Sequence, residues 1–182
     1  MNWIEIFRSG ISTGTVLLIA AIGETLTERS GIQNLGVEGM MLVGAMAGFK
    51  VAYQSGNVWL GLLAAIAAGG LLSLAHALVT IHFQADQTVS GLSLTFLGTG
   101  LALVLGDGLT GMTAPVIPSF TIPLLSQVPY LGPVAFANHN LLVYVGYLLV
   151  PLSWYYIHKT RPGLHLRARS EERRVGKECR SR

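Results

Sequence analysis

Four polar side chains with the means for chemistry, His76, His82, Asp86 and Ser90, fall close together in an otherwise apolar chain. Imidazole and carboxylate groups are common metal ligands, so the first three could suit a metal site. Ser90 with His76 and Asp86 could instead form an intramembrane hydrolase, with nucleophile, base and orienting acid. Two of the four flank a predicted helix end, where His is common, and no nucleophile motif surrounds Ser90. We therefore expect no metal site and no catalytic residue.

A glycine-rich segment, GDGLTG (106–111), matches the letter pattern of a dinucleotide-binding loop. Such a loop needs a preceding strand and a following helix. Here a long apolar run precedes the glycines and prolines follow them, so we predict a turn and no cofactor. The chain also has no Walker A sequence, and we do not expect it to hydrolyse ATP by that route.

The most informative polar stretch is ERSGIQNLGVEGMM (28–41), which separates two hydrophobic runs. Asn34 is a good N-cap for a helix starting near Leu35. Glu38 would then lie in the first turn, where the helix dipole favours an acid. One interpretation is a capped helix start at an interface. The other is a discontinuous segment inside a bundle, since ionisable groups at membrane depth usually line pathways.

A second polar stretch, ADQTVSG (85–91), has the same form: a polar cap, then glycine, then an apolar helix. Two such segments in one bundle favour a pathway. The residues that we expect to line or gate it are Asn34, Glu38, Gln87 and Ser90.

The composition indicates which elements must position these residues. Of 182 residues, 51% are hydrophobic and 12% are charged, whereas soluble domains carry about 25% charged residues. This excludes an ordinary soluble domain and predicts a membrane protein. Five apolar runs are candidates for spans of about 20 residues: 11–23, 35–53, 58–81, 89–106 and 141–157. Three clusters of small residues, GAMAG (44–48), AAGG (67–70) and GTG (98–100), predict close helix packing. We expect an all-α, polytopic transmembrane helical bundle with about five spans.

The distribution of Lys and Arg predicts the orientation. His158, Lys159 and Arg161 follow the last span, which indicates a cytoplasmic end and not a nucleic-acid-binding segment. The connection 107–139 has no Lys or Arg, so we place it outside. Arg8 and Lys50 would then lie near the outer face, which argues mildly against this orientation.

The outer connection carries five prolines, Pro115, Pro118, Pro123, Pro129 and Pro133. This spacing argues against any regular helix. Apolar patches between the prolines predict that the connection packs onto the outer mouth of the bundle.

Four segments carry a resemblance to a known family. GETLTERSGIQNLGVEGMMLVGA (23–45) resembles the N-terminal signature of permease subunits of ABC importers for nucleosides and simple sugars. These belong to the wider family of branched-chain amino-acid and ribose permeases. ADQTVSGLSLTFLGTGL (85–101) resembles a second signature, IPLLSQVPYLGP (122–133) an outer loop, and TRPGLHLRA (160–168) the start of a cytoplasmic coupling segment.

The resemblance implies a multi-pass subunit of the cell inner membrane that moves a nucleoside or simple sugar by alternating access. Its implied partners are a second permease subunit, cytoplasmic ATPases and an extracytoplasmic substrate-binding lipoprotein. A secondary transporter or channel without an ATPase, and an intramembrane enzyme using His76, Asp86 and Ser90, stay open as alternatives.

The resemblance ends at Ala168. The family continues into a coupling loop and further spans, whereas this chain continues RSEERRVGKECRSR. We expect residues 1–168 to be the N-terminal part of a permease domain. We expect residues 169–182 to be a basic tail foreign to the family, either artefactual or disordered, and a chain truncated in this way not to transport.

Overall fold

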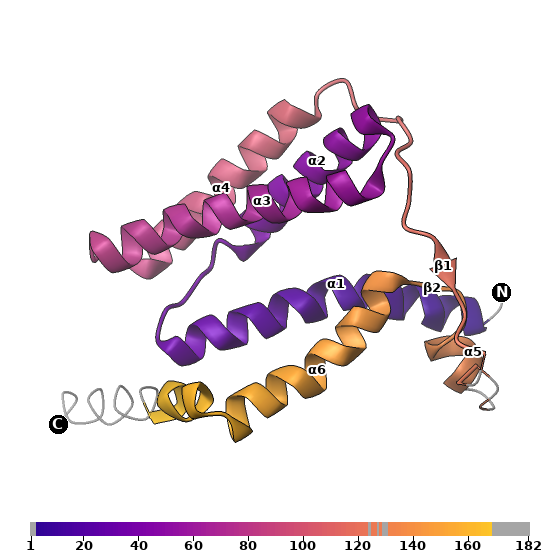
Figure 1. Ribbon diagram of the computed structural model, residues 1–182. Helices are drawn as coiled ribbons and strands as arrows, with labels where there is room; N and C mark the ends of the chain where they lie inside the picture. The colour runs from indigo at the N-terminus through magenta and orange to yellow at the C-terminus, as the bar shows by residue number, and fades with distance from the viewer. Residues whose placement is uncertain (1–2, 124, 127, 129–130, 169–182) are drawn as a thin grey trace. The chain divides into compact units, whose positions relative to one another are not determined.

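The computed structural model describes residues 3–123, 125–126, 128 and 131–168. Helices dominate, and the two strands among these residues have two residues each, so the predicted all-α fold is confirmed (Figure 1). The predicted foreign tail lies outside the described residues.

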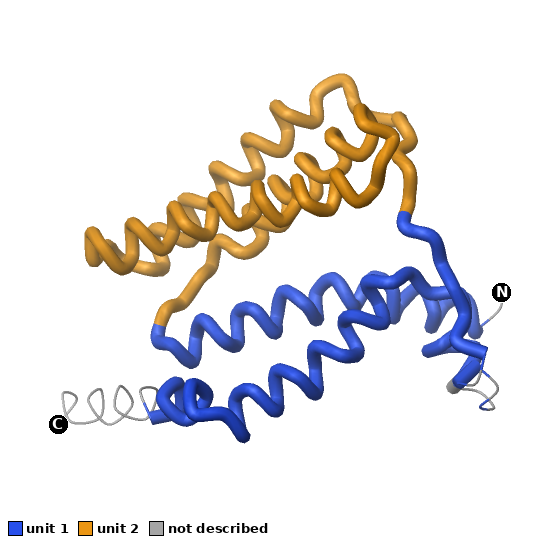
Figure 2. The backbone as a smooth tube through the Cα atoms, viewed as in Figure 1, with its two compact units in different colours: residues 1–31, 117–182 blue, residues 32–116 orange. Residues whose placement is uncertain are grey.

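The chain divides into two compact units, shown in Figure 2. Unit 1 comprises Met1–Gly31 and Ile117–Arg182, and unit 2 comprises Ile32–Val116. Each unit is described by itself below.

Four helices among the described residues are long and apolar enough to cross a membrane: Trp3–Ser30, Val58–His82, Gln87–Gly106 and Leu141–Lys159. The remaining predicted span corresponds to α2 (Val37–Ser55), which contains Glu38 and Lys50 and is not among the four. The short predicted run 11–23 lies inside the 28-residue helix α1 (Trp3–Ser30). Residues on both sides of the run therefore supply the length that a span requires.

In unit 2, α2 and α3 (Val58–Ala77) form a hairpin with a connection of two residues. Gly56 takes the left-handed conformation that ends many helices, with φ of 66°. The side chain of Asn57 then accepts a hydrogen bond from the N–H of Trp59 at 2.9 Å and caps α3.

Helix α2 contacts both α3 and α4 (Gln87–Gly106), and glycines bring the backbones close together. A Cβ atom placed on Gly61 of α3 would lie 2.6 Å from the Cβ of Ala52 and from the carbonyl oxygen of Gly48 on α2. A Cβ atom on Gly98 of α4 would lie 2.6 Å from the Cα of Gly39. The predicted close helix packing is therefore confirmed at these two helix crossings.

The end of α3 widens into a π-helical turn, η1 (Leu78–His82). The N–H of Phe83 donates to the carbonyl of Leu78 at 3.2 Å, and Gln84 reverses the chain with φ of 52°. Such turns are often found at functional sites. At the other end of α4, Gly108 and Gly111 have φ of 75° and 83°, which confirms the predicted turn.

Unit 1 contains α1, α6 (Leu141–Lys159) and residues 117–139, the larger part of the predicted outer connection. Gly146 of α6 faces Thr15 of α1, where an added Cβ atom would lie 2.7 Å from the Cγ2 atom of Thr15. A separate helical stretch, residues 161–168, follows α6.

The described residues among 117–139 pack onto the N-terminal ends of α1 and α6. Packing onto the outer mouth of the bundle stays a prediction. β1 (Ser119–Phe120) pairs antiparallel with β2 (His139–Asn140), and the hydroxyl of Tyr144 donates to the carbonyls of Phe120 and Phe136 at 3.0 and 3.1 Å. The guanidinium of Arg8 donates to the carbonyl of Pro133 at 2.9 Å, so this cation has a structural use near the predicted outer face.

The expectation that no helix forms in the connection was wrong, because α5 (Leu131–Ala135) contains Pro133. Proline is tolerated there since α5 is a single turn, where its missing N–H has no partner to lose.

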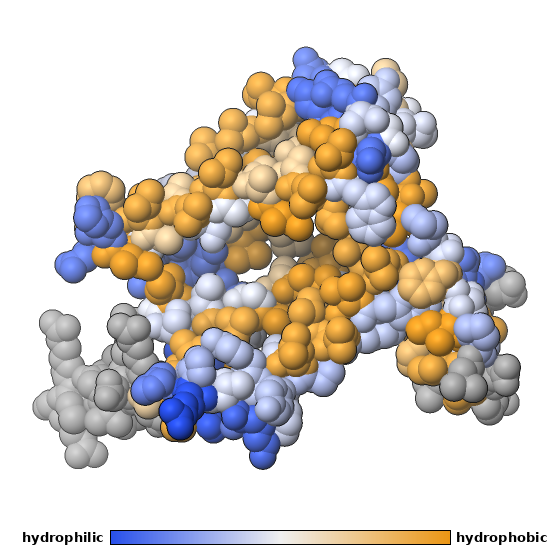
Figure 3. Space-filling model, viewed as in Figure 1, coloured by the Kyte–Doolittle hydropathy of each residue, from blue (hydrophilic) through white to orange (hydrophobic). Residues whose placement is uncertain are grey.

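Apolar side chains cover the outside of the helices. Phe96 and Val104 of α4 are each 75% exposed, as expected for a surface that faces lipid. Figure 3 shows apolar residues along the middle of α3 and α4 and hydrophilic residues gathered at their ends.

Candidate functional site

The segment before α2 is not helical, and its geometry differs from the prediction. Residues 32–34 have no regular structure, and α2 begins at Val37 with Gly36 as the N-cap residue. Asn34 does not cap the helix, which was a wrong expectation. Its Oδ1 atom accepts a hydrogen bond from the N–H of Gly36 at 3.0 Å and so closes a turn that delays the helix start.

Side chains of the neighbouring helices bind the backbone of this segment. The N–H of Gln33 donates to Oε1 of Gln87 at 2.9 Å, and the hydroxyl of Thr95 donates to the carbonyl of Leu35 at 2.9 Å. The carbonyl of Gln33 lies 3.4 Å from Nε2 of His76. Irregular backbone is tolerated at membrane depth only when its polar groups have partners, and these side chains provide partners for three of them.

Glycine makes the close approach of this segment to α4 possible. A Cβ atom on Gly91 would lie 2.8 Å from the backbone nitrogen of Leu35, and one on Gly36 would lie 3.1 Å from the carbonyl oxygen of Gly91. The segment therefore lies directly on the first turns of α4, the second polar stretch in the sequence. The two stretches that the sequence singled out separately are in contact.

His76 lies at the centre of this contact and is only 3% exposed. Its Nδ1 atom lies 3.1 Å from the hydroxyl oxygen of Ser90. Asp86 does not complete a triad, because its Oδ1 atom accepts a hydrogen bond from the N–H of Val89 at 2.9 Å and caps α4. The arrangement is a histidine between a hydroxyl and a backbone carbonyl.

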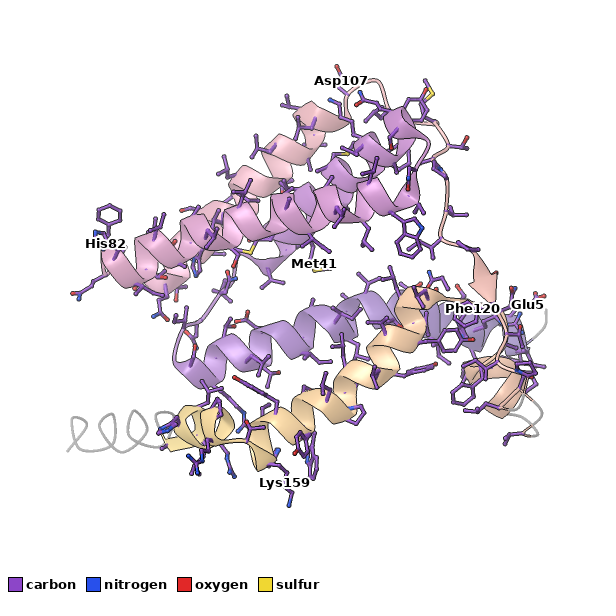
Figure 4. All side chains as sticks on the ribbon, in the orientation of Figure 1. Glu5, Met41, His82, Asp107, Phe120 and Lys159 are labelled. Carbon is purple, nitrogen blue, oxygen red and sulfur yellow. The ribbon has the colours of Figure 1, made fainter. Side chains whose placement is uncertain are left out.

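The described residues contain no group of three or more His, Cys, Asp or Glu side chains that could hold a metal ion. Figure 4 shows His82 at the end of η1, at the opposite end of unit 2 from Asp107. The side chain of His82 is exposed, whereas His76 is buried in the preceding helix.

A cavity of about 510 Å³ lies between the C-terminal part of α3 and the N-terminal half of α4. Its volume is within the range of small-molecule sites. His76, Asp86, Ser90 and Ser93 supply its polar groups. The apolar lining consists of Ala75, Val79, Ala85, Val89, Leu94 and Leu97.

The structure brings together three of the four predicted path residues. Asn34 shapes the segment, Gln87 holds its backbone and Ser90 contacts His76. Ser90 alone of the four lines the cavity. Glu38 is exposed in the first turn of α2, as predicted, and takes no part in these contacts.

Two contributors were not predicted from the sequence. The hydroxyl of Thr95 donates to the backbone carbonyl of Leu35, and no sequence pattern indicates such a contact. Sequence patterns indicate His76 only as a possible metal ligand or enzyme residue. A single histidine inside an uncharged 24-residue stretch, 58–81, is nevertheless a signal of a functional position.

Comparison with known proteins gives consistent matches. The profile of a family described as "Branched-chain amino acid transport system / permease component" matches residues 6–177. The provisionally named glucose ABC transporter permease protein TsgC13 of Haloferax volcanii is 38% identical over 171 residues, which cover 92% of this chain and 52% of that protein.

Two further relatives come from bacteria. The guanosine ABC transporter permease protein NupQ of Bacillus subtilis is 36% identical, with 85% of this chain and 52% of that protein covered. The nucleoside ABC transporter permease protein NupC of Lactococcus lactis is 33% identical, with 86% and 53% covered. The chain thus spans about half the length of the curated relatives it matches. No solved structure matches the chain.

Proposed function

We propose a transport function for this chain, which belongs to the family of permease components of branched-chain amino acid transport systems, whose profile matches residues 6–177. It is a multi-pass membrane protein, and its proposed role is that of a transport subunit and not of an enzyme. We propose that it forms part of the permease of an ATP-binding-cassette importer in the cell inner membrane and that the substrate is a nucleoside or a simple sugar. The observation that carries this proposal is the similarity to permeases named for glucose, guanosine and nucleosides.

The proposed partners are a second permease subunit, cytoplasmic ATPase subunits and an extracytoplasmic substrate-binding lipoprotein. ATP binding and hydrolysis would occur on the ATPase subunits. Differential contacts between the permease and the two states of the ATPases would shift the permease between its inward-open and outward-open forms.

The geometry of unit 2 supports a path near the two polar stretches. Transporters commonly place substrate contacts where a helix is interrupted and its freed backbone is bound by neighbouring helices. The segment before α2 has this form, with its backbone held by Gln87 and His76. We propose that Asn34, Glu38, Gln87 and Ser90 line or gate the path. Glu38 is the charged residue among these four, and its side chain is exposed in the first turn of α2.

The test is uptake of radiolabelled nucleosides and sugars into membrane vesicles that contain the complete permease, its ATPase and its binding protein. We expect ATP-dependent uptake of at least one of these compounds. Vesicles that hydrolyse ATP but accumulate none of them would contradict the proposed substrate class.

Glu38→Gln tests the path itself. We expect uptake to fall strongly while the amount of protein in the membrane stays normal. The matched control is Glu5→Gln, because Glu5 is also an exposed acid in the first turn of a helix. Both changes remove a favourable contact with a helix dipole, about 0.3–1 kcal/mol. Equal uptake by the Glu38→Gln and Glu5→Gln variants would show that Glu38 does not line the path.

A further inference from the structure

A single residue of the irregular segment, Gln33, is held at both of its backbone polar groups. Gln87 of α4 accepts a hydrogen bond from its N–H at 2.9 Å, and His76 of α3 faces its carbonyl at 3.4 Å. The side chain of Gln33 is exposed and takes no part. We call this arrangement of Gln33, His76, Gln87 and Ser90 the Gln33 clamp.

The partners of His76 determine which ring nitrogen carries the proton. A carbonyl oxygen can only accept, so the contact between Nε2 and the carbonyl of Gln33 is a hydrogen bond only when Nε2 carries the hydrogen. In the neutral ring Nδ1 is then an acceptor, and the hydroxyl of Ser90, 3.1 Å away, donates to it. Both ring nitrogens thus have a partner, as a buried histidine requires.

The position of His76 along α3 is also held. The hydroxyl of Thr80 donates to the carbonyl of His76 at 2.8 Å, across the start of the π-helical turn. Thr80 is 7% exposed, so this contact is buried as well. The carboxylate of Asp86 lines the same cavity but is engaged by the N–H of Val89.

We infer that His76 is a positioning residue that fixes the segment before α2 on α3 and α4 through the Gln33 clamp. The role for transport rests on the proposed function, because the clamp sets the positions of Asn34, Gln87 and Ser90. In this role His76 holds a backbone carbonyl with one ring nitrogen and a hydroxyl with the other.

Three substitutions separate the two contacts of His76. His76→Gln places an amide near Nε2 and can still donate to the carbonyl of Gln33. His76→Asn places its amide near Nδ1 and keeps only the contact with Ser90. His76→Leu removes both. A role limited to filling space would make the three variants behave alike, whereas the clamp predicts that glutamine alone restores the segment.

The first measurement needs no transport. A nitroxide label on Gln33→Cys reports the mobility of the segment by its EPR line shape and leaves the backbone contacts in place. The single cysteine of the chain, Cys179, is replaced by serine so that only position 33 is labelled. We expect an immobilised label with His76 and with His76→Gln, and a mobile label with His76→Asn and His76→Leu. His82→Leu is the control, since His82 is exposed at the end of η1 and should leave the label unchanged. The same line shape in all variants would overturn the inference.

Nitrogen-15 NMR of the unsubstituted chain identifies the protonated ring nitrogen of His76 directly, so this test needs no variant that folds. We expect the His76 ring to carry its proton on Nε2 and none on Nδ1. A proton on Nδ1 alone would overturn the assignment, because Nε2 could then not donate to Gln33.

The second measurement is the KM for uptake by the complete transporter. We expect His76→Leu and His76→Asn to raise KM by about ten-fold, the size expected for a lost buried hydrogen bond, and His76→Gln to restore most of the loss. A mobile label with unchanged KM would show that the clamp does not position the path. Absence of uptake with the unsubstituted protein would contradict the proposed function instead, and the EPR and NMR results would still decide the clamp.

Discussion

Replacing Gly98 by alanine should force α2 and α4 apart. A Cβ atom at this position would lie 2.5 Å from the carbonyl oxygen of Gly39, 2.6 Å from its Cα and 2.7 Å from its carbonyl carbon. Ordinary van der Waals contacts begin at 3.4 Å. All three atoms belong to the backbone of α2, so no flexible side chain can move aside. The helices must therefore separate by nearly 1 Å at this crossing.

The expected cost follows from that separation. Inserting a methyl group into a tightly packed contact typically costs about 1–3 kcal/mol, and a gap of up to 1 Å weakens neighbouring dispersion contacts by a quarter to a half. We therefore expect Gly98→Ala to lower the free energy of unfolding by about 1–3 kcal/mol. Reversible unfolding in mixed detergent micelles, followed by far-UV circular dichroism, measures this change.

Gly100→Ala is the matched control. Gly100 lies on the same helix, and an added Cβ atom there has nothing within 4 Å. Alanine favours helix over glycine by about 1 kcal/mol, so this change should be neutral or stabilising. The double variant Gly39→Ala with Gly98→Ala should cost less than the sum of the single changes, because the first already separates the helices. Equal stability of Gly98→Ala and Gly100→Ala would refute the reasoning.

Three further predictions concern topology, the outer connection and a helix cap. A reporter active only outside the cytoplasm should be active when fused near Pro118 and silent when fused after Arg161; the opposite pattern would reverse the orientation. Arg8→Gln removes the guanidinium that donates to the carbonyl of Pro133. Limited proteolysis from the outside should therefore cut the connection faster than in the unsubstituted protein, and an unchanged rate would show that the contact does not hold the connection in place. Asp86→Ala removes the cap of α4 and should lower the unfolding free energy by about 1 kcal/mol, whereas Asp86→Asn should restore most of it.

Much of the fold follows from local sequence patterns. The apolar runs predict the long helices, and Asp86 caps α4 because its side chain and the N–H that it binds are three residues apart. Asn34 has the same chemistry, yet it closes a turn ahead of α2. The difference comes from Gln87, His76 and Thr95, which bind the backbone around it. These partners are distant in sequence, so local rules could not predict the later helix start.

Small residues show the same limit. The clusters 44–48, 67–70 and 98–100 all predict close packing. Gly48 and Gly98 do lie against neighbouring backbones, whereas Gly70 and Gly100 have open space beside them. Composition indicates that helices approach closely, and only the three-dimensional arrangement determines which glycine lies at a crossing.

The two-residue connection between α2 and α3 has a consequence for biosynthesis. α2 contains Glu38 and Lys50 and is less suited than its neighbour to partition into lipid alone, whereas α3 with η1 is the most apolar of the candidate spans. Only two residues separate the helices, and the glycine contacts that join them need both helices to be present. We therefore expect the two helices to enter the bilayer together as one hairpin.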